Sequence, residues 1–392
     1  MLNRLYGKYK DLDFAGSNGR INALDLYRFI AIFLMIQGHT IFEFAAPGYI
    51  DNSTWNWSIW TFVRGLTAPV FMLISGAVNV YASKRNPDGS VDNMRILKRL
   101  KTAVFLLLTA YVLAFPATSL RFLDQFDMDF WIRFWQTNIL HIVAICLIIL
   151  QIFLKLTKSH KQLMWVALAF GTFATGISYF VQQTDWYSIL PTYLAPYLSY
   201  QKGAIYTLFP VSAYFFFGVA IGTYLKTRKK EELFKAVFIN ATRIGLVLLA
   251  VGIPAYFTIN GWQYSYCPIG VINPGAVIMR MGIVLTIFPL IVILNEKVKK
   301  FSWLYLALSK KSLFLFVTHL IVIYGCSCFP GFNGLWSHQL TGINLILSAA
   351  LVEVVSMSIA FYYDKTIKFL PSIRYAYLSV IVMVVLMINI II

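Results

Sequence analysis

Long apolar segments recur along the chain from residue 24 to the C-terminus, separated by short polar stretches. A run of about 20 apolar residues matches the hydrocarbon thickness of a bilayer, because an α-helix rises about 1.5 Å per residue. The pattern therefore predicts an all-α, polytopic integral membrane protein. We expect about eleven transmembrane helices, at residues 24–44, 58–82, 102–120, 134–154, 162–182, 205–225, 236–258, 272–294, 312–329, 340–362 and 375–392.

The same pattern indicates how the chain is organised. Residues 1–22 are polar and charged, which predicts a cytoplasmic arm, and residues 23–392 are expected to form a single transmembrane domain. Residues 301–311 (FSWLYLALSKK) are expected to form a short interfacial helix before the ninth span.

Lys and Arg residues concentrate in alternate loops, and this sets the expected orientation. With the N-terminus inside, most of the 33 Lys and Arg residues fall on the inner side, and the outer loops carry only Arg121, Arg133 and Lys202. Because positively charged loops remain in the cytoplasm, we expect a cytoplasmic N-terminus and an external C-terminus.

Composition restricts the classes of function. Hydrophobic residues make up 59% of the chain and charged residues only 12%, about half the charged share of a soluble domain. The net charge of +17 is explained by basic loops beside anionic lipid, so we expect a lipid bilayer as partner and no nucleic acid. The four cysteines (Cys146, Cys267, Cys326 and Cys328) show no metal-ligand spacing, and no metal is expected.

Ionisable residues form one stripe on the first apolar segment. Arg28 and His39 are eleven residues apart, about three turns, so both side chains point the same way about 16 Å apart along the axis. Asp25 and Glu43 extend the stripe in both directions at helical spacing. Charges inside a span are costly and usually mark a pathway or a site. We expect Glu43 to orient His39 or hold its proton.

The alternative, purely structural roles in this stripe are a helix–helix hydrogen bond for His39 and an interfacial anchor for Arg28. Arg64 lies in the second span at about the depth of His39, where it could stabilise a developing oxyanion. Lys84 and Arg85 follow that span at the inner surface, where they would attract phosphates.

Further polar and aromatic residues stay open between a structural and a functional role. Asn138 and His141 are three residues apart at the start of the fourth span, and His319 lies about a third of the way into the ninth. Each is either a structural hydrogen-bonding residue or part of a site. Trp57, in an aromatic outer segment, belongs either to the interfacial belt or to a surface on which a sugar ring stacks.

Several segments resemble the transmembrane acyltransferase superfamily. RINALDLYRFIAIFLMIQGH resembles its opening span, with an Arg followed eleven residues later by a His, and APVFMLISG resembles the end of its second conserved segment. LHIVAICLIIL, FPVSAYFFFGVAIG and SKKSLFLFVTHL resemble later blocks of one branch. That branch includes lysosomal heparan-α-glucosaminide N-acetyltransferase and bacterial relatives, and its sister branch O-acetylates bacterial surface polysaccharides.

The resemblance implies transfer of an acetyl group from cytoplasmic acetyl-CoA to an extracytoplasmic sugar or glycan, in a bacterial cytoplasmic (inner) membrane. Arg28 would be the family's first-span Arg, His39 its catalytic His, and His319 the His of the ninth-span block. In the lysosomal enzyme the proposed catalytic His lies in a luminal loop. The corresponding stretch here, DNSTWNWS, contains no His, so the role is assigned to His39.

These considerations give a set of expected roles. We expect the catalytic residues to be His39, Glu43 and Arg64. Acetyl-CoA would be bound by Arg28, Lys84, Arg85 and His319. The acceptor would be bound by Asn138, His141 and Trp57.

The alternative function is a proton-coupled transporter or flippase for a glycan or small solute, because intramembrane Arg, His and Glu also suit transport. The two halves of the chain show no convincing repeat, which favours the enzyme. The sequence leaves open the acceptor, the acyl chain length, O- or N-acylation, direct transfer or an acyl-enzyme, and a homodimer.

Overall fold

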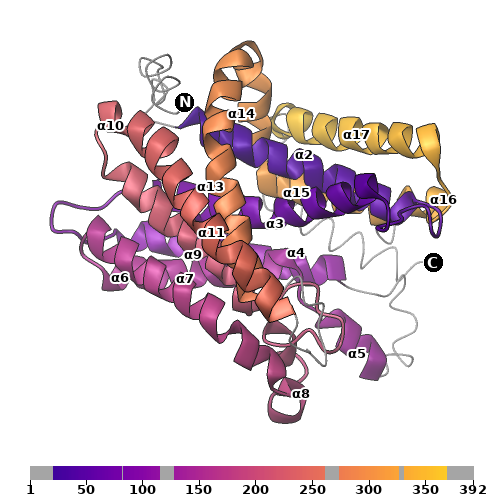
Figure 1. The fold of residues 1–392 in the computed structure, drawn as a ribbon, viewed down its shortest axis with the longest axis horizontal. Coiled ribbons are helices and arrows are strands. Elements are labelled where there is room, and N and C mark those ends of the chain that lie inside the picture. Colours follow the sequence, from indigo (N-terminus) through magenta and orange to yellow (C-terminus); the bar gives the residue numbers. More distant parts are fainter. Residues whose placement is uncertain (1–20, 82, 115–127, 261–272, 326–330, 369–392) are drawn as a thin grey trace. The chain divides into compact units, whose positions relative to one another are not determined.

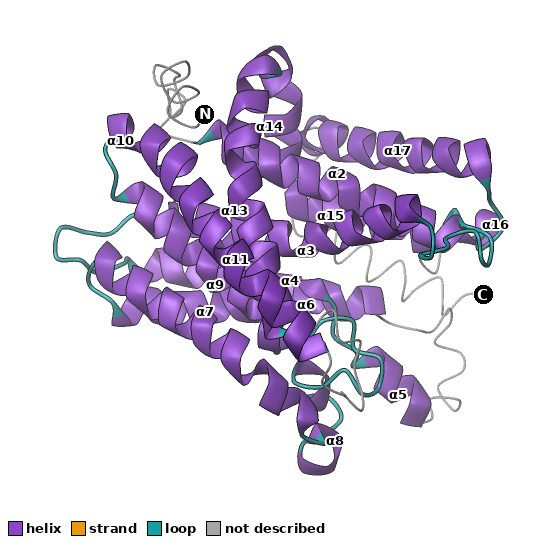
Figure 2. Ribbon diagram, in the orientation of Figure 1, coloured by secondary structure: helices purple, strands orange, loops and turns teal. Residues whose placement is uncertain are grey.

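The computed structural model describes residues 21–81, 83–114, 128–260, 273–325 and 331–368. All elements named within these ranges are helices, joined by short loops (Figure 2). Eight of them are long and apolar enough to cross a membrane, and a ninth span results if two helices bent by 76° count as one. The prediction of an all-helical, polytopic membrane protein is confirmed.

The count of eleven spans is not settled by the described residues. The span expected at 375–392 lies outside them, as does the end of the span expected at 102–120. The described part of the latter belongs to α4 (Asn93–Ala114), which is not among the eight because its first turns carry four basic residues.

The helices form two compact units, and α2 (Asn22–Phe44) and α3 (Trp55–Tyr81) contribute residues to both. Figure 1 labels the helices and colours them in chain order. Unit 1 comprises residues 1–27, 68–115 and 128–298. Its other elements are α4, α5 (Met128–Phe134), α6 (Ile139–Leu156), α7 (His160–Gln183), α8 (Trp186–Ile189), η2 (Ala195–Tyr197), α9 (Leu208–Lys226), α10 (Lys230–Lys235), η3 (Ala236–Asn240), α11 (Ala241–Asn260) and α13 (Pro274–Lys297).

Small residues bring α3 and α9 into backbone contact within unit 1. A Cβ atom on Gly76 would overlap the carbonyl oxygen of Phe215, and one on Gly218 would overlap that of Leu73. Gly222 meets Ala77 in the same way one turn further along. Such close approach is how small residues join helices in a membrane, where lipid provides no hydrophobic drive. Gly76 and the Gly218-x-x-x-Gly222 motif therefore pack α3 against α9.

Unit 2 comprises residues 28–67, 116–127 and 299–392. Beyond its parts of α2 and α3, it contains η4 (Lys299–Phe301), α14 (Ser302–Lys310), α15 (Ser312–Tyr324), α16 (Asn333–Trp336) and α17 (Gly342–Lys368). The short helix expected at 301–311 corresponds to α14.

The bend between α14 and α15 is tied to α17. Lys311, at the bend, donates from Nζ to the carbonyl oxygens of Ala360 and Phe361 at 2.9 and 3.3 Å. The end of α2 is fixed on the same unit, because the backbone N–H of His338 donates to the Glu43 carbonyl at 3.0 Å. These contacts hold α2 and α15 in the positions that the site requires.

We expect Gly218→Ala to destabilise unit 1, because its methyl group has no space beside the Leu73 backbone. Overpacking of this kind costs about 1–3 kcal/mol, which a thermal melt of the purified protein would show as a lower Tm. Gly176→Ala in α7 is the matched control, because a Cβ there meets nothing within 4 Å. Equal melting of the two variants would contradict the close crossing of α3 and α9.

Candidate active site

The expected site residues fall into two groups. Arg28, His39, Glu43, Trp57, Arg64 and His319 belong to unit 2, and Lys84, Arg85, Asn138 and His141 belong to unit 1.

The central feature of unit 2 is a pair of histidines. His39 on α2 and His319 on α15 are 280 positions apart in the chain, yet Nδ1 of His39 lies 3.1 Å from Nε2 of His319. Their rings are stacked, with centroids 5.3 Å apart and an angle of 25° between planes. His319 is fully buried, whereas His39 is partly exposed. His319 is therefore the buried member of the pair, and His39 is the accessible one.

The hydrogen bonds assign the protons of the neutral pair. Nδ1 of His319 lies 3.2 Å from the carbonyl oxygen of Leu315, which can only accept, so His319 carries its proton on Nδ1. Nε2 of His319 is then an acceptor, and His39 must donate to it from Nδ1. Nε2 of His39 is left with a lone pair, which is the state a general base needs.

Arg64 brings a positive charge to this pair. Its guanidinium lies over the rings of Phe42 and Trp60, at 4.2 and 5.3 Å from the centroids, and it acts electrostatically on His39. The side chain runs across Gly38, where a Cβ would come within 2.8 Å of Arg64 Cγ. Gly38 therefore leaves room for Arg64 beside the residue that follows it, His39.

Glu43 lies one turn beyond His39 but faces another residue. Its carboxylate acts electrostatically on the Tyr324 hydroxyl at the end of α15, and Arg64 also acts on Tyr324. The partner that orients His39 is thus His319, where the sequence suggested Glu43. Glu43 and Tyr324 extend the polar group by one turn.

Arg28 is the inner end of the polar stripe on α2. It is 8% exposed, and its Nη1 donates to the carbonyl oxygen of Ser309 on α14 at 3.5 Å. This contact places the guanidinium at the bend between α14 and α15 rather than in a free interfacial position.

Trp57 belongs to an aromatic cluster at the start of α3. Its ring meets those of Tyr49 and Trp60 edge-on, at centroid distances of 5.6 and 5.5 Å. The Tyr49 hydroxyl accepts from the backbone N–H of Gly342 at 2.9 Å, which fixes the cluster on α17. Trp60 also contacts the Arg64 guanidinium. The aromatic cluster therefore extends along α3 as far as Arg64.

Unit 1 holds a separate, basic cavity of about 490 Å³. Four basic residues line it: Lys84, and from the first turns of α4 Arg95, Lys98 and Arg99. The other lining residues include Ser83, Thr102 and Gln151. Asp92, 3.9 Å from Arg95, offsets one of these charges. The cavity therefore has a net positive charge suited to a phosphate group.

A buried amide side chain forms part of the lining of this cavity. Gln151 on α6 is 2% exposed, and its Nε2 donates to the carbonyl oxygen of Leu147 at 3.1 Å. Its Oε1 has no hydrogen-bond partner within the described residues. A buried acceptor without a partner is costly, and a ligand N–H group would satisfy it.

Arg85 has a structural role at this point. Its guanidinium donates to the carbonyl oxygens of Gly89, Leu154 and Thr157 and to the Thr157 hydroxyl. These groups include the last carbonyls of α6, which a cation at a helix C-terminus stabilises. Partial burial lowers the pKa of Arg85, but a guanidinium stays charged. The geometry favours a helix cap over the expected role in cofactor binding.

Asn138 and His141 form a capping box at the start of α6. The Asn138 side chain accepts from the backbone N–H of Leu140 at 2.9 Å, and Nδ1 of His141 accepts from the backbone N–H of Asn138 at 3.1 Å. His141 is fully buried against Tyr111, with ring centroids 4.4 Å apart. The two side chains begin a helix, and Nε2 of His141 has no hydrogen-bond partner among the described residues. Their expected contact with an acceptor stays a prediction.

Several residues near the two histidines and the basic cavity were not predicted from the sequence, and some of them show a recognisable sequence pattern. Arg95, Lys98, Arg99 and Thr102 follow the i, i+3, i+4, i+7 spacing of one helix face, and Gln151 is a lone amide in an apolar run. Gly38 and Tyr324 show no such pattern, because their role arises only when α3 and α15 meet α2.

Comparison with known proteins identifies one family. Residues 20–257 match the family model described as "Heparan-alpha-glucosaminide N-acetyltransferase, catalytic". No curated protein matches the chain. The matched range contains His39, Arg64, Lys98 and Gln151, and His319 lies beyond it. The resemblance seen in the sequence is confirmed.

We expect Arg85→Gln to lower the stability of the protein, because three backbone carbonyls lose a charged donor. Hydrogen bonds to charged groups contribute about 1.5–3 kcal/mol, so the loss should be visible in a thermal melt. Lys84→Gln is the neighbouring control and should melt as the wild type does, because Lys84 is exposed. An unchanged Tm for Arg85→Gln would contradict the capping role.

Proposed function

This chain belongs to the family of heparan-α-glucosaminide N-acetyltransferase catalytic domains, and from that premise we propose a specific reaction. The protein transfers an acetyl group from cytoplasmic acetyl-CoA to a hydroxyl or amine of a sugar or glycan on the other side of the membrane. The N-terminus is cytoplasmic, and the membrane is a bacterial inner membrane. The observation that carries the proposal is the hydrogen-bonded pair of His39 and His319.

The pair supplies the base. Nε2 of His39 removes the proton from the acceptor hydroxyl or amine, whose oxygen or nitrogen attacks the thioester carbonyl carbon. The new C–O or C–N bond forms as the C–S bond breaks, and His39 returns the proton to the departing thiolate. His319 holds the ring of His39 in the required tautomer, because its Nε2 accepts from Nδ1 of His39. The same hydrogen bond stabilises the imidazolium that forms during transfer.

Arg64 stabilises the charge that develops on the carbonyl oxygen. Its stem is held by Gly38 and its guanidinium by Phe42 and Trp60, so the positive charge is already in place before reaction. Glu43 and Tyr324 form the polar boundary of this group. The rings of Trp57, Trp60 and Tyr49 offer apolar faces on which a sugar can stack.

The donor binds through the basic cavity of unit 1. Lys84, Arg95 and Lys98 pair with the phosphates of the nucleotide portion, and Oε1 of Gln151 accepts a hydrogen bond from an N–H group of the donor. Net positive charge and an unsatisfied buried acceptor are the two features that support this assignment.

We expect His39→Ala to abolish acetyl transfer, because it removes the proposed base and the ring that donates to His319. His319→Ala should reduce kcat by 10²–10⁴-fold, roughly the contribution of acid–base catalysis, with little change in KM. The measurement is thiol release from acetyl-CoA, with labelled acetyl found on a glycan acceptor, by purified protein in nanodiscs.

The matched control for both variants is His338→Asn. His338 is an exposed loop histidine at positive φ, a conformation that Asn tolerates, and it should leave kcat unchanged. Acetyl transfer at the wild-type rate by folded His39→Ala would overturn the assignment. Solute movement across sealed vesicles without thiol release would favour the transporter instead.

We expect Lys98→Gln and Gln151→Leu to raise KM for acetyl-CoA about tenfold, the effect of losing one charge-assisted or buried hydrogen bond. Gln151→Leu should keep or raise Tm, because it removes a buried acceptor that the protein leaves unsatisfied. Lys101→Gln is the control on the same helix, since Lys101 does not line the cavity. A KM for Lys98→Gln equal to that of Lys101→Gln would contradict donor binding here.

A further inference from the structure

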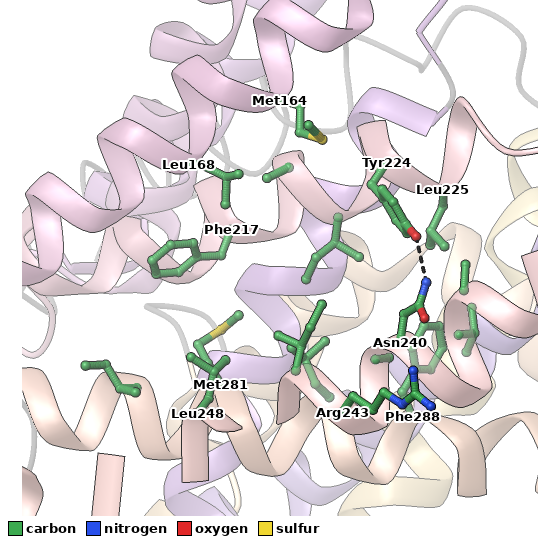
Figure 3. A pocket seen from close by; sticks show the side chains of 18 residues that line it. Met164, Leu168, Phe217, Tyr224, Leu225, Asn240, Arg243, Leu248, Met281 and Phe288 are labelled. Carbon is green, nitrogen blue, oxygen red and sulfur yellow. Dashed lines mark hydrogen bonds between the residues drawn. The ribbon is translucent and has the colours of Figure 1, made fainter. Parts of the chain in front are cut away.

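Unit 1 contains a second, larger cavity that shares no residue with the basic one. It has a volume of about 550 Å³ and lies between α7 and α9 on one side and η3, α11 and α13 on the other (Figure 3). Most of its lining is apolar, including Leu168, Phe217, Leu248 and Met281. Ile244, which also lines it, is 52% exposed, so the cavity opens on the surface of the unit as a cleft.

One end of this cleft is polar. Figure 3 shows Tyr224, Asn240 and Arg243 close together there, with Leu168, Phe217 and Leu248 toward the opposite end. Nδ2 of Asn240 donates to the Tyr224 hydroxyl at 2.9 Å. Asn240 closes η3, a single π-helical segment between α10 and α11, and such segments are frequent at functional sites.

Arg243 has an unbalanced charge at this end. It is exposed, it lies in a helix long and apolar enough to span the membrane, and no ion pair or hydrogen bond joins it to another described residue. It follows Glu232, the start of that span, by eleven residues, about 16 Å of helix. An Arg at this depth is costly unless its side chain extends toward the interface and meets an anion.

The charge of the neighbouring segment, residues 226–235, indicates which kind of lipid the cleft favours. Tyr224 lies two residues before Lys226, and residues 226–235 carry five basic and two acidic residues. Arg228 pairs with Glu232 at 3.6 Å, and the segment keeps a net positive charge. A loop of this charge attracts anionic lipid headgroups of the adjoining leaflet. Under the orientation proposed above, a glycan acceptor would lie at the opposite face.

We propose that the cleft binds one anionic phospholipid from the leaflet that contacts residues 226–235. An acyl chain occupies the apolar part between α7 and α11, and the phosphate pairs with Arg243 through charge-assisted hydrogen bonds. Asn240 and Tyr224 present polar atoms to the glycerol region. The occupant balances the charge of Arg243 and covers the apolar surface that the helices leave open.

The test is native mass spectrometry of delipidated, full-length protein in detergent, titrated with dioleoyl phosphatidylglycerol or dioleoyl phosphatidylcholine. We expect one phosphatidylglycerol to bind the wild type at least about tenfold more tightly than phosphatidylcholine, because the ion pair is available only to a net anionic headgroup. Arg243→Gln should lose this preference, and Arg243→Lys should keep most of it. Leu248→Trp, which fills the apolar end, should weaken phosphatidylglycerol binding by a similar factor.

Val247→Trp is the matched control. Val247 precedes Leu248 on α11, is 63% exposed and does not line the cleft, so its variant should bind as the wild type does. Equal binding of the two lipids by the wild type, or unchanged preference in Arg243→Gln, would overturn the proposal. Selective displacement of phosphatidylglycerol by a polyprenyl phosphate would also overturn it, in favour of a lipid-linked substrate. Thermal melting of each variant shows whether a loss of binding reflects unfolding.

Discussion

A hydrogen bond between two imidazoles, contributed by helices at opposite ends of the chain, is the interaction on which the proposed chemistry of this protein depends. His319 is fully buried and donates to a backbone carbonyl, so its other nitrogen can only accept. That single constraint fixes the proton on Nδ1 of His39 and leaves Nε2 of His39 basic. A lone histidine in a membrane span would have no such preference between its two nitrogens.

Other residues of unit 2 support the helices and charges around this hydrogen bond. Gly38 lets the stem of Arg64 lie against α2, and two aromatic rings hold its guanidinium there. The contacts of Lys311 with α17, and of Arg28 with the end of α14, fix the bend from which α15 presents His319. The costs of placing charges and imidazoles at membrane depth are thus offset by specific partners, which is the usual condition for their presence there.

The sequence predicted the helices well because each span is a long apolar run, and it singled out His39 and Arg64 as candidates because charges inside such runs are rare. It placed His319 in a separate group of residues, since no spacing rule relates position 39 to position 319. The binding roles expected for Arg85, Asn138 and His141 stay predictions, and the structure shows that these side chains cap helix ends. Whether a polar side chain caps a helix or faces a ligand depends on which carbonyl or N–H group lies beside it, and only the folded chain shows that.

The basic cavity and the apolar cleft of unit 1 illustrate the same limit. The basic stripe on α4 is visible in the sequence, yet its meeting with Gln151 requires the packing of α4 on α6. Arg243 reads in the sequence as one more charge in a span, and becomes informative only because the apolar cleft ends beside it. In both cases the ligand is proposed from a polar group at a cavity rather than from the residue type.

The most direct test of the central claim is the protonation state of the two histidines. Nitrogen-15 NMR of histidine-labelled protein in nanodiscs, with resonances assigned by comparing His39→Gln and His319→Gln variants, distinguishes protonated from unprotonated ring nitrogens. The account predicts a neutral pair in which both residues carry their proton on Nδ1 and both Nε2 atoms are unprotonated. A proton found on Nε2 of His39, with Nδ1 unprotonated, would contradict it, because His39 could then neither donate to His319 nor act as the base.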